Sequence, residues 1–213
     1  MEFSFNIINF IYSSIGFLIA ITVHEFSHAY TADALGDPTP RLAGRVSLNP
    51  LRHLDVVGTM MIILIHFGWG KPVPTNPKYF RKPLAYSTFT AIVGPLSNLL
   101  LAILIAVFMK YTQDFSPAWM RDMFTIIIWT NIMLCVFNLI PIPPLDGSHL
   151  IGLFIPQKYS NAYMRFMESG QIYLILFIAA DYLLISRWFG FSILESIVGT
   201  ISNYLMIVVF LGA

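Results

Sequence analysis

The segment ITVHEFSHAY, residues 21–30, places two histidines and a glutamate at the end of an apolar run. His24, Glu25 and His28 form the pattern H-E-x-x-H. On a helix, residues four positions apart lie on one face, so both imidazoles can reach one metal ion while the neighbouring carboxylate takes a proton from water. A catalytic zinc ion takes three protein ligands and keeps one position open, so the pattern indicates zinc-dependent hydrolysis.

This motif supplies only two of the three protein ligands. Asp33 lies about 140° round the helix from His28, so it faces away. The candidates that remain are Asp55, His66, Asp146, His149 and Asp181. Asp146 is favoured because prolines stiffen the segment NLIPIPPLDG (138–147) and Gly147 permits a sharp turn directly after the carboxylate.

The composition is typical of a membrane protein. Of the 213 residues, 57% are hydrophobic and 11% are charged, which favours a multi-spanning membrane protein over a soluble domain. The formal net charge is +1, so no basic field indicates nucleic acid as a partner. Cys135, the single cysteine, lies in an apolar segment, so no disulfide framework is expected.

Five apolar segments have about the length that crosses a lipid bilayer. They cover residues 7–23 with a helical extension to about 35, then 84–109, 123–140, 172–186 and 191–213. We therefore predict an all-α membrane protein with about five transmembrane helices and one intramembrane domain over residues 1–213. Its catalytic core would cover about residues 5–155, and a C-terminal helical hairpin about residues 171–213.

Two further segments lie between the first and second spans. Residues 56–68 form an apolar stretch too short to cross a bilayer, which favours a buried, re-entrant or interfacial element. In GWGKPVPTNPKYF, residues 68–80, glycines and prolines forbid a helix. Because prolines cannot donate to a sheet ladder, we expect a small extended, β-hairpin-like loop whose strand would lie at an edge.

The distribution of basic residues predicts the orientation. With alternating spans, nine of the twelve Lys and Arg lie in the loops 37–83 and 141–171, and three lie on the other side. The positive-inside rule then places both loops in the cytoplasm and the N-terminus outside. The H-E-x-x-H motif and Asp146 would both lie at cytoplasmic ends of spans.

Several motifs together resemble a known family. HEFSH (24–28), GPLSN (94–98) and NLIPIPPLDG are similar, in type and order, to motifs of the site-2 protease family of intramembrane zinc metalloproteases. The segments NPLRHLDVVGT (49–59) and GWGKPVPTNP (68–77) are similar to its compact prokaryotic branch without PDZ or CBS domains. The resemblance covers residues from about 15 to 150. Ser148 stands where many relatives carry a second glycine.

The resemblance implies a site and a reaction. One Zn²⁺ per chain would be held by His24, His28 and Asp146, with Glu25 as the general base. Family motifs also include Gly94, Asn98 and Asn138, which would permit close packing or hold the substrate or the developing oxyanion. The chain would be a zinc metalloendopeptidase of a prokaryotic cytoplasmic membrane, acting on single-span membrane proteins in regulated intramembrane proteolysis or in clearance of signal-peptide remnants.

A helical substrate must unwind before it is cut, because each carbonyl group is bonded within the helix and lipid offers no replacement partner. The extended loop can supply partners by strand pairing, for which we expect Lys71, Val73, Thr75 and Asn76. A loop that merely connects two elements is an equally open interpretation. His149 follows Asp146 closely enough to support a metal ligand indirectly.

Two other classes of function fit parts of the pattern. A membrane metal-ion transporter also uses intramembrane His, Asp and Glu, although it would distribute them through the bilayer depth rather than toward one side. A non-catalytic binding protein with the same fold would not need the intact motif. Glu25 separates the three hypotheses, since only a protease needs it as a base.

Overall fold

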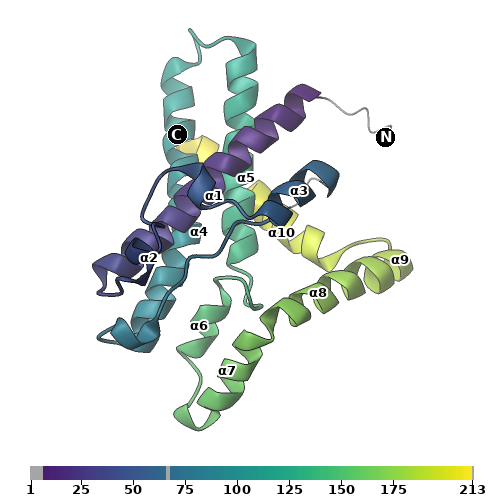
Figure 1. Cartoon of the computed structure of the whole chain (residues 1–213). Helices are drawn as coiled ribbons and strands as arrows, with labels where there is room; N and C mark the ends of the chain where they lie inside the picture. The colour runs from purple at the N-terminus through teal and green to yellow at the C-terminus, as the bar shows by residue number, and fades with distance from the viewer. Residues whose placement is uncertain (1–6, 66–67, 213) are drawn as a thin grey trace.

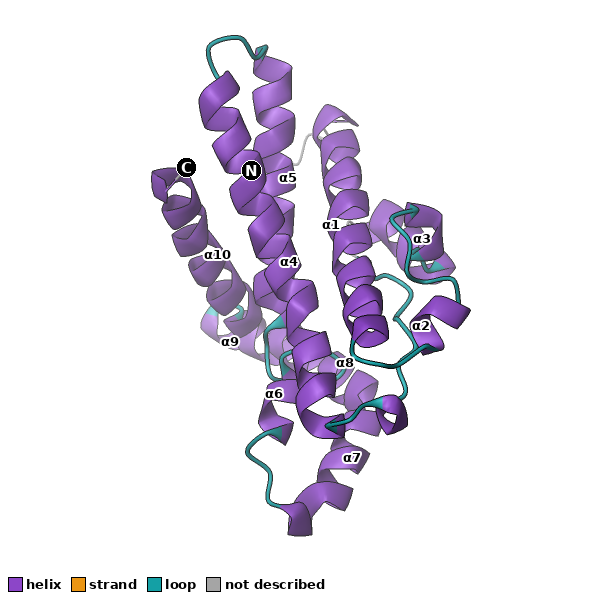
Figure 2. Ribbon diagram, turned by 90° about the vertical axis from the view of Figure 1, so that its left-hand side faces the viewer, coloured by secondary structure: helices purple, strands orange, loops and turns teal. Residues whose placement is uncertain are grey.

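The three helices that carry the sequence motifs form the centre of the molecule. The computed structural model describes residues 7–65 and 68–212. In it, α1 (Ile7–Ala34), α4 (Pro83–Thr112) and α5 (Ala118–Asn138) pack against one another, with α4 and α5 joined by a short turn at one end (Figure 1, Figure 2). The described residues form no sheet, so the predicted all-α class is confirmed.

Small residues on α4 let its neighbours approach closely. Ala102 and Ala106 are buried against Ile128 and Ile132 of α5, and Val198 of α10 (Ile193–Gly212) completes this cluster. Lipid is as apolar as these side chains, so close van der Waals packing rather than removal from water holds such helices together. The cluster fixes α5 relative to α4, and α5 leads directly to Asp146.

The first span is a single helix that ends where the sequence predicts. Gly36 takes a left-handed φ of 106°, and the amide of Asp37 donates to the carbonyl oxygen of Ala32 at 2.9 Å. Glycine takes such a φ without strain, so α1 stops here and the chain turns. The continuation of the first apolar run through His28 is therefore confirmed.

The second span contains Gly94 and Pro95, two residue types that disfavour a helix interior. Both lie inside α4, which continues without a break from Pro83 to Thr112. Proline removes one backbone hydrogen bond, but a membrane helix tolerates this loss when neighbouring helices pack around it, and Pro95 is fully buried.

Short elements connect α1 to α4. They are α2 (Thr39–Leu42), η1 (Pro50–Arg52), α3 (Val56–Ile65) and η2 (Pro77–Tyr79). With 10 residues, α3 is too short to span a bilayer, and it lies beside α1 in both views (Figure 1, Figure 2). The last residues of the expected 56–68 element, His66 and Phe67, lie outside the described part of the chain.

The expected β-hairpin is not formed in the described residues. The loop after α3 makes one isolated antiparallel bridge, between Leu54 and Gly70, and the amide of Lys71 donates to the carbonyl oxygen of His53 at 2.8 Å. Prolines at 72, 74 and 77 remove the donors that a longer ladder would need. The loop is extended, but its backbone is largely unpaired.

After α5 the chain forms a series of shorter helices before the last span. They are α6 (Ser148–Gly152), η3 (Gln157–Tyr159), α7 (Ser160–Glu168), α8 (Gly170–Ala180), η4 (Asp181–Ile185) and α9 (Ser186–Phe189). The run from α8 to α9 leaves the bundle, and α10 returns to it, so the two diverge from their turn as a wide V (Figure 1). Asp181 closes the turn, accepting hydrogen bonds from the amides of Ile193 at 2.7 Å and Leu194 at 3.2 Å.

Five helices in the described residues are long and apolar enough to cross a membrane. They are Ile7–Ala34, Pro83–Thr112, Ala118–Asn138, Gly170–Phe189 and Ile193–Gly212. This agrees with the number and order of the spans predicted from the sequence. The chain therefore has the architecture of a multi-pass membrane protein.

Candidate metal centre and cavity

Three side chains from two distant parts of the sequence meet at one point. The Nε2 atoms of His24 and His28 are 3.0 Å apart, and Oδ2 of Asp146 lies 3.1 Å from the first and 3.4 Å from the second. Among the described residues, this is the group of His, Cys, Asp or Glu placed to hold a metal ion. Histidine nitrogens and a carboxylate oxygen are the ligands that catalytic zinc prefers.

The hydrogen bonds of the two rings settle which nitrogen faces the centre with a lone pair. Nδ1 of His28 lies 2.7 Å from the carbonyl oxygen of Thr90, which can only accept, so Nδ1 carries the proton. Nδ1 of His24 lies 2.9 Å from Oδ1 of Asn98 and donates to it in the same way. In the neutral rings both Nε2 atoms are therefore free to bind a metal.

This arrangement favours a bound cation. Two imidazole lone pairs and a carboxylate oxygen point at one another, and Oδ2 of Asp146 is buried without a hydrogen-bond donor in the described structure. With both rings neutral, such a cluster is repulsive, and a bound metal ion would relieve the repulsion. A zinc ion with three ligands and one open position fits the donor set.

The orientation of Asn98 is fixed by its own partners. Its Nδ2 donates to the carbonyl oxygen of Ala20 at 3.1 Å and to Oδ1 of Asn131 at 3.0 Å, so Oδ1 must face His24. Asn131 is fixed in turn, since its Nδ2 donates to the carbonyl oxygen of Ile127 at 2.9 Å. Both asparagines are fully buried. Asn98 therefore orients the imidazole of His24, and both of its donor hydrogens are already used.

Asn131 was not singled out in the sequence, although a signal was present. It is an amide in the middle of an apolar span, seven positions before Asn138. Polar side chains inside membrane spans face protein partners rather than lipid. That rule would have marked Asn131 as a contact between helices, but not as a partner of Asn98.

Gly94 lies directly against the two imidazoles. A Cβ atom at this position would overlap the ring of His28 and lie 3.0 Å from Cε1 of His24. Because Nε2 of His28 is among the overlapped atoms, a methyl group would occupy the side of the ring that faces the metal centre. A residue without a side chain lets α4 approach the ligands this closely.

The third ligand is placed by a tight fold of the chain after α5. The amide of Gly147 donates back to the carbonyl oxygen of Asn138 at 2.7 Å, and the amide of Leu145 donates to that of Ile142 at 2.9 Å. A Cβ on Gly147 would collide with the backbone of Leu139. The glycine thus lets the loop lie against the end of the helix, and Asp146 projects toward α1.

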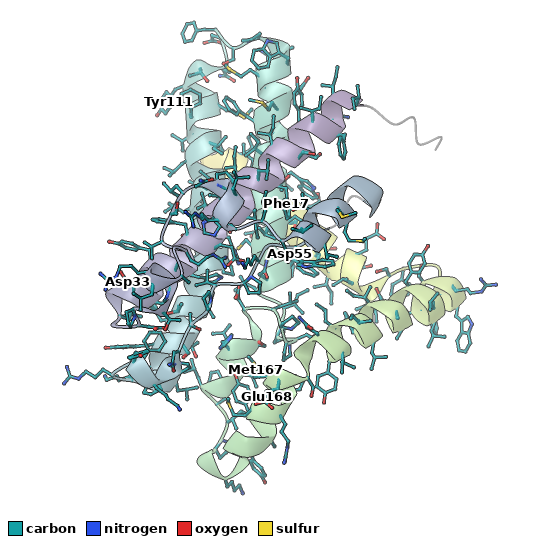
Figure 3. All side chains as sticks on the ribbon, viewed as in Figure 1. Phe17, Asp33, Asp55, Tyr111, Met167 and Glu168 are labelled. Atoms are coloured by element: carbon teal, nitrogen blue, oxygen red, sulfur yellow. The ribbon has the colours of Figure 1, made fainter. Side chains whose placement is uncertain are left out.

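Other acidic residues considered as ligands have different partners. Asp33, labelled near the end of α1 in Figure 3, forms an ion pair with Arg41 at 3.3 Å. Asp55 accepts a hydrogen bond from the amide of Gly58 at 2.8 Å at the start of α3. Asp181 holds the turn before α10. These contacts account for all three without a metal.

Glu25 lies beside the metal centre and borders the same cavity. Its side chain is buried, and Oε2 accepts no hydrogen bond in the described structure. The nearest cation is Arg45, whose guanidinium nitrogen lies 3.8 Å from Oε2. A carboxylate with a free lone pair next to the ligands can take a proton from water there. Arg45 was not selected from the sequence, where it is one of seven basic residues in a loop.

A cavity of about 670 Å³ opens in front of the metal centre. Its walls come from α1, the loop after α3, the start of α4, the segment that carries Asp146, and α8. Phe17, labelled on α1 in Figure 3, is one of its lining residues. Apolar area dominates the lining, which suits a hydrophobic peptide segment.

Some of the remaining predicted site residues line this cavity and others do not. Asn138 and His149 line it, whereas Asn98 does not. Nδ2 of Asn138 donates to the carbonyl oxygen of Leu134 at 3.0 Å, which leaves its second hydrogen available. Burial lowers the pKa of the His149 imidazole and outweighs the opposing effect of the Asp146 carboxylate. No side-chain hydrogen bond joins His149 to Asp146 in the described part.

Of the four loop residues expected to pair with a substrate, two have amides that are already bonded and two have free amides. The amides of Lys71 and Asn76 already donate within the protein, to the carbonyl oxygen of His53 at 2.8 Å and to Oδ2 of Asp37 at 2.6 Å. Val73 and Thr75 line the cavity, and their amides have no hydrogen-bond partner in the described structure. The unpaired backbone thus lies between two anchored ends.

Comparisons with known proteins agree with this chemistry. The family model of peptidase family M50 matches residues 112–179, which include Asp146. "Putative zinc metalloprotease YwhC" of Bacillus subtilis is 37% identical over 175 residues, which are 78% of this chain and 80% of that protein.

More distant relatives carry the same description. "Putative zinc metalloprotease Rip2" of Mycolicibacterium smegmatis is 25% identical over 179 residues, which are 82% of this chain and 68% of that protein. The protein of that name from Mycobacterium tuberculosis is 26% identical over similar shares. No solved structure matches the chain. With five membrane-length helices and a zinc-type ligand set, the chain belongs to peptidase family M50, the site-2 protease family of zinc metalloproteases.

Proposed function

We propose that the protein is an intramembrane zinc metalloendopeptidase that cuts single-span membrane proteins in or near their transmembrane segments. The observation that supports this most directly is the position of Glu25. Its free carboxylate borders the same cavity as the three converging ligand atoms of His24, His28 and Asp146. A metal transporter needs such ligands but has no use for a base beside them.

Each residue has a defined part in peptide hydrolysis. His24, His28 and Asp146 would hold a zinc ion, which would supply a Lewis acid for the scissile carbonyl group and for the attacking water. Glu25 takes the proton of the attacking water and returns it to the leaving amine. Asn138, with one amide hydrogen available at the cavity wall, is placed to bind the substrate carbonyl or the developing oxyanion.

The substrate would bind as an extended segment. Unwinding a transmembrane helix exposes backbone groups that lipid cannot satisfy. The free amides of Val73 and Thr75 offer hydrogen bonds at the cavity wall, and alternate residues of an extended peptide can accept them. The loop would therefore stabilise the unwound form and present one carbonyl group to the metal centre.

We further propose that the site faces the cytoplasm of a prokaryotic cell, with the N-terminus outside the plasma membrane. Nine of the twelve basic residues support this orientation. We expect an impermeant thiol reagent to label Asp114→Cys, in the α4–α5 turn, in intact cells. Lys158→Cys should be labelled only after the membrane is permeabilised, and the reverse pattern would refute the orientation.

The test of the reaction is Glu25→Gln in the full chain, reconstituted in lipid vesicles with a fluorogenic single-span peptide. We expect zinc content to stay at one per chain while cleavage falls by at least about a hundredfold, the scale of general-base catalysis. Glu195→Gln makes the same change at an exposed position of α10 and should cleave normally. Unchanged cleavage by Glu25→Gln, or zinc flux that survives the substitution, would contradict the proposal.

A further inference from the structure

We propose that Asp37 and Arg45 are positioning residues that anchor the two ends of the loop segment 71–76, and that Arg45 also fixes this segment relative to Glu25. This inference rests on the proposed function, because it assigns a purpose to the segment that would bind the substrate backbone. Neither residue belongs to the H-E-x-x-H motif or to the loop itself. Both lie in the connection between α1 and α3.

Arg45 anchors the first end of the segment. Its side chain is buried, and its guanidinium donates to two successive carbonyl oxygens, to that of Pro72 at 2.9 Å and to that of Lys71. A buried guanidinium is costly without acceptors, so these bonds are maintained rather than exchanged with water. The planar fork holds two adjacent peptide groups in one orientation, which a lysine cannot do.

Asp37 anchors the second end. It is fully buried, and both carboxylate oxygens are used: Oδ1 accepts from the amide of Thr39 at 3.0 Å and Oδ2 from the amide of Asn76 at 2.6 Å. Asp37 lies three residues after the end of α1 at Ala34, so it joins the loop to the helix that carries His24 and His28. The hydrogen bond to the amide of Asn76 is made by the Asp37 carboxylate.

Between these two anchors, only some of the backbone amides have no hydrogen-bond partner in the described structure. Pro72 and Pro74 have no amide hydrogen, so Val73 and Thr75 carry the only unused amides of the segment, and both residues line the cavity. A free loop of this length would lose conformational entropy when it pairs with a peptide. Anchoring both ends removes part of that cost before the substrate arrives.

Arg45 has a second contact that Asp37 lacks. Its guanidinium lies 3.8 Å from Oε2 of Glu25 while holding the carbonyl oxygens of residues 71 and 72. One planar guanidinium group therefore contacts both the proposed catalytic base and the backbone that would bind the substrate. Displacement of reacting groups by about 1 Å can cost a hundredfold in rate, so this spacing bears on kcat as well as on KM.

The two anchors can be distinguished kinetically. We would compare Asp37→Asn, Arg45→Lys and Arg45→Met in the full chain in vesicles, with the fluorogenic single-span peptide as probe. Asp37→Asn should raise KM about tenfold through the loss of one charged hydrogen bond, with kcat within about twofold of wild type. Arg45→Met should raise KM similarly and also lower kcat at least about tenfold, with zinc content unchanged.

A conservative variant and a matched control complete the comparison. Arg45→Lys keeps the charge beside Glu25 but not the two-carbonyl fork, so it should recover most of kcat while KM stays high. Asp33 and Arg41 form a neighbouring Asp–Arg ion pair that does not line the cavity. Asp33→Asn and Arg41→Met should therefore change neither kcat nor KM. Equal changes in kcat for Asp37→Asn and Arg45→Met would indicate general structural damage and overturn the inference.

A second measurement does not depend on cleavage. A nitroxide label at Thr75→Cys, in a Cys135→Ala background, reports the mobility of the segment directly. Asp37→Asn and Arg45→Met should both increase the mobility of the label, whereas Asp33→Asn should not. An unchanged spectrum would refute the anchoring role, whereas failure of the proposed function would appear separately as a wild-type protein that does not cleave.

Discussion

The two walls of the cavity are built in opposite ways. On one wall, side chains of α1, α4 and the segment after α5 converge, and each imidazole is oriented by a hydrogen bond from its other nitrogen. On the other wall, a proline-rich loop presents unpaired backbone between two anchored ends. The first wall would hold an ion of fixed geometry, and the second a peptide of variable sequence.

The difference follows from what each wall must bind. A metal ion tolerates little displacement of its ligands, so rigid helices and buried amides position them. A peptide backbone offers the same donors and acceptors whatever its side chains are, so unpaired main-chain groups suffice to bind it. Substitutions of the ligands and of the side chains that orient them should change metal affinity. Loss of a free amide in the loop should weaken substrate binding and leave metal affinity unchanged.

The largest effect should come from the third ligand. Asp146→Ala removes one of three metal ligands and should lower zinc affinity by more than about a hundredfold, beyond the range seen for supporting residues. Competition with a chelator measures this directly. Asp122→Ala removes an exposed carboxylate near the other end of α5 and should bind zinc normally. Normal zinc affinity in Asp146→Ala would show that the first wall does not bind zinc through Asp146.

A single methyl group on α4 should have the next largest effect. Gly94→Ala would place Cβ against the imidazoles of His28 and His24, so we expect at least about a tenfold loss of zinc affinity. Gly199→Ala is the matched control, because a Cβ there meets no atom within 4 Å. If both variants bind zinc as well as wild type, close approach of α4 is not needed.

The hydrogen-bond chain behind His24 should give a graded response. Asn98→Leu removes the acceptor for Nδ1 and should weaken zinc binding about 10- to 100-fold. Asn131→Leu should have a smaller effect, because Ala20 still orients the amide of Asn98. Chelator competition on both variants checks the order. A larger loss in Asn131→Leu than in Asn98→Leu would contradict the proposed direction of support.

The smallest effect should come from the second wall. Val73→Pro removes one free amide and should raise KM about 2- to 10-fold, the scale of one net hydrogen bond, with zinc affinity unchanged. Val73→Ala keeps the amide and serves as the control. Peptide titrations and zinc measurements on the same samples provide the test. A loss of zinc in Val73→Pro would show that the two walls are not independent.

Much of the first wall follows from the sequence, because its signals are local. The spacing of His24 and His28 fixes their common helix face, and the apolar runs predict the spans that carry them. Asp146 was favoured as the third ligand because of the prolines and Gly147 around it. The structure shows that Gly147 packs closely against Leu139, which places the Asp146 carboxylate, rather than that of Asp55 or Asp181, beside the histidines.

Contacts between distant segments were less predictable. Asn98 carries a polar group suited to several tasks, and only its partners Ala20 and Asn131 show that it orients His24. Arg45 is one basic residue among seven in its loop, and nothing in the neighbouring sequence distinguishes it. The expected β-hairpin is absent from the described residues because prolines remove the donors that a second strand would need.

The separation of the ligands along the chain also bears on how the protein is made. Two ligands enter the membrane with the first span, whereas Asp146 follows the third, after Gly94 and Asn98 have arrived with the second. A partly synthesised chain therefore carries histidines without the carboxylate that completes the centre. The full set of three ligands exists only once Asp146 has been made, so the chain cannot cut its substrates while its first two spans alone are in the membrane.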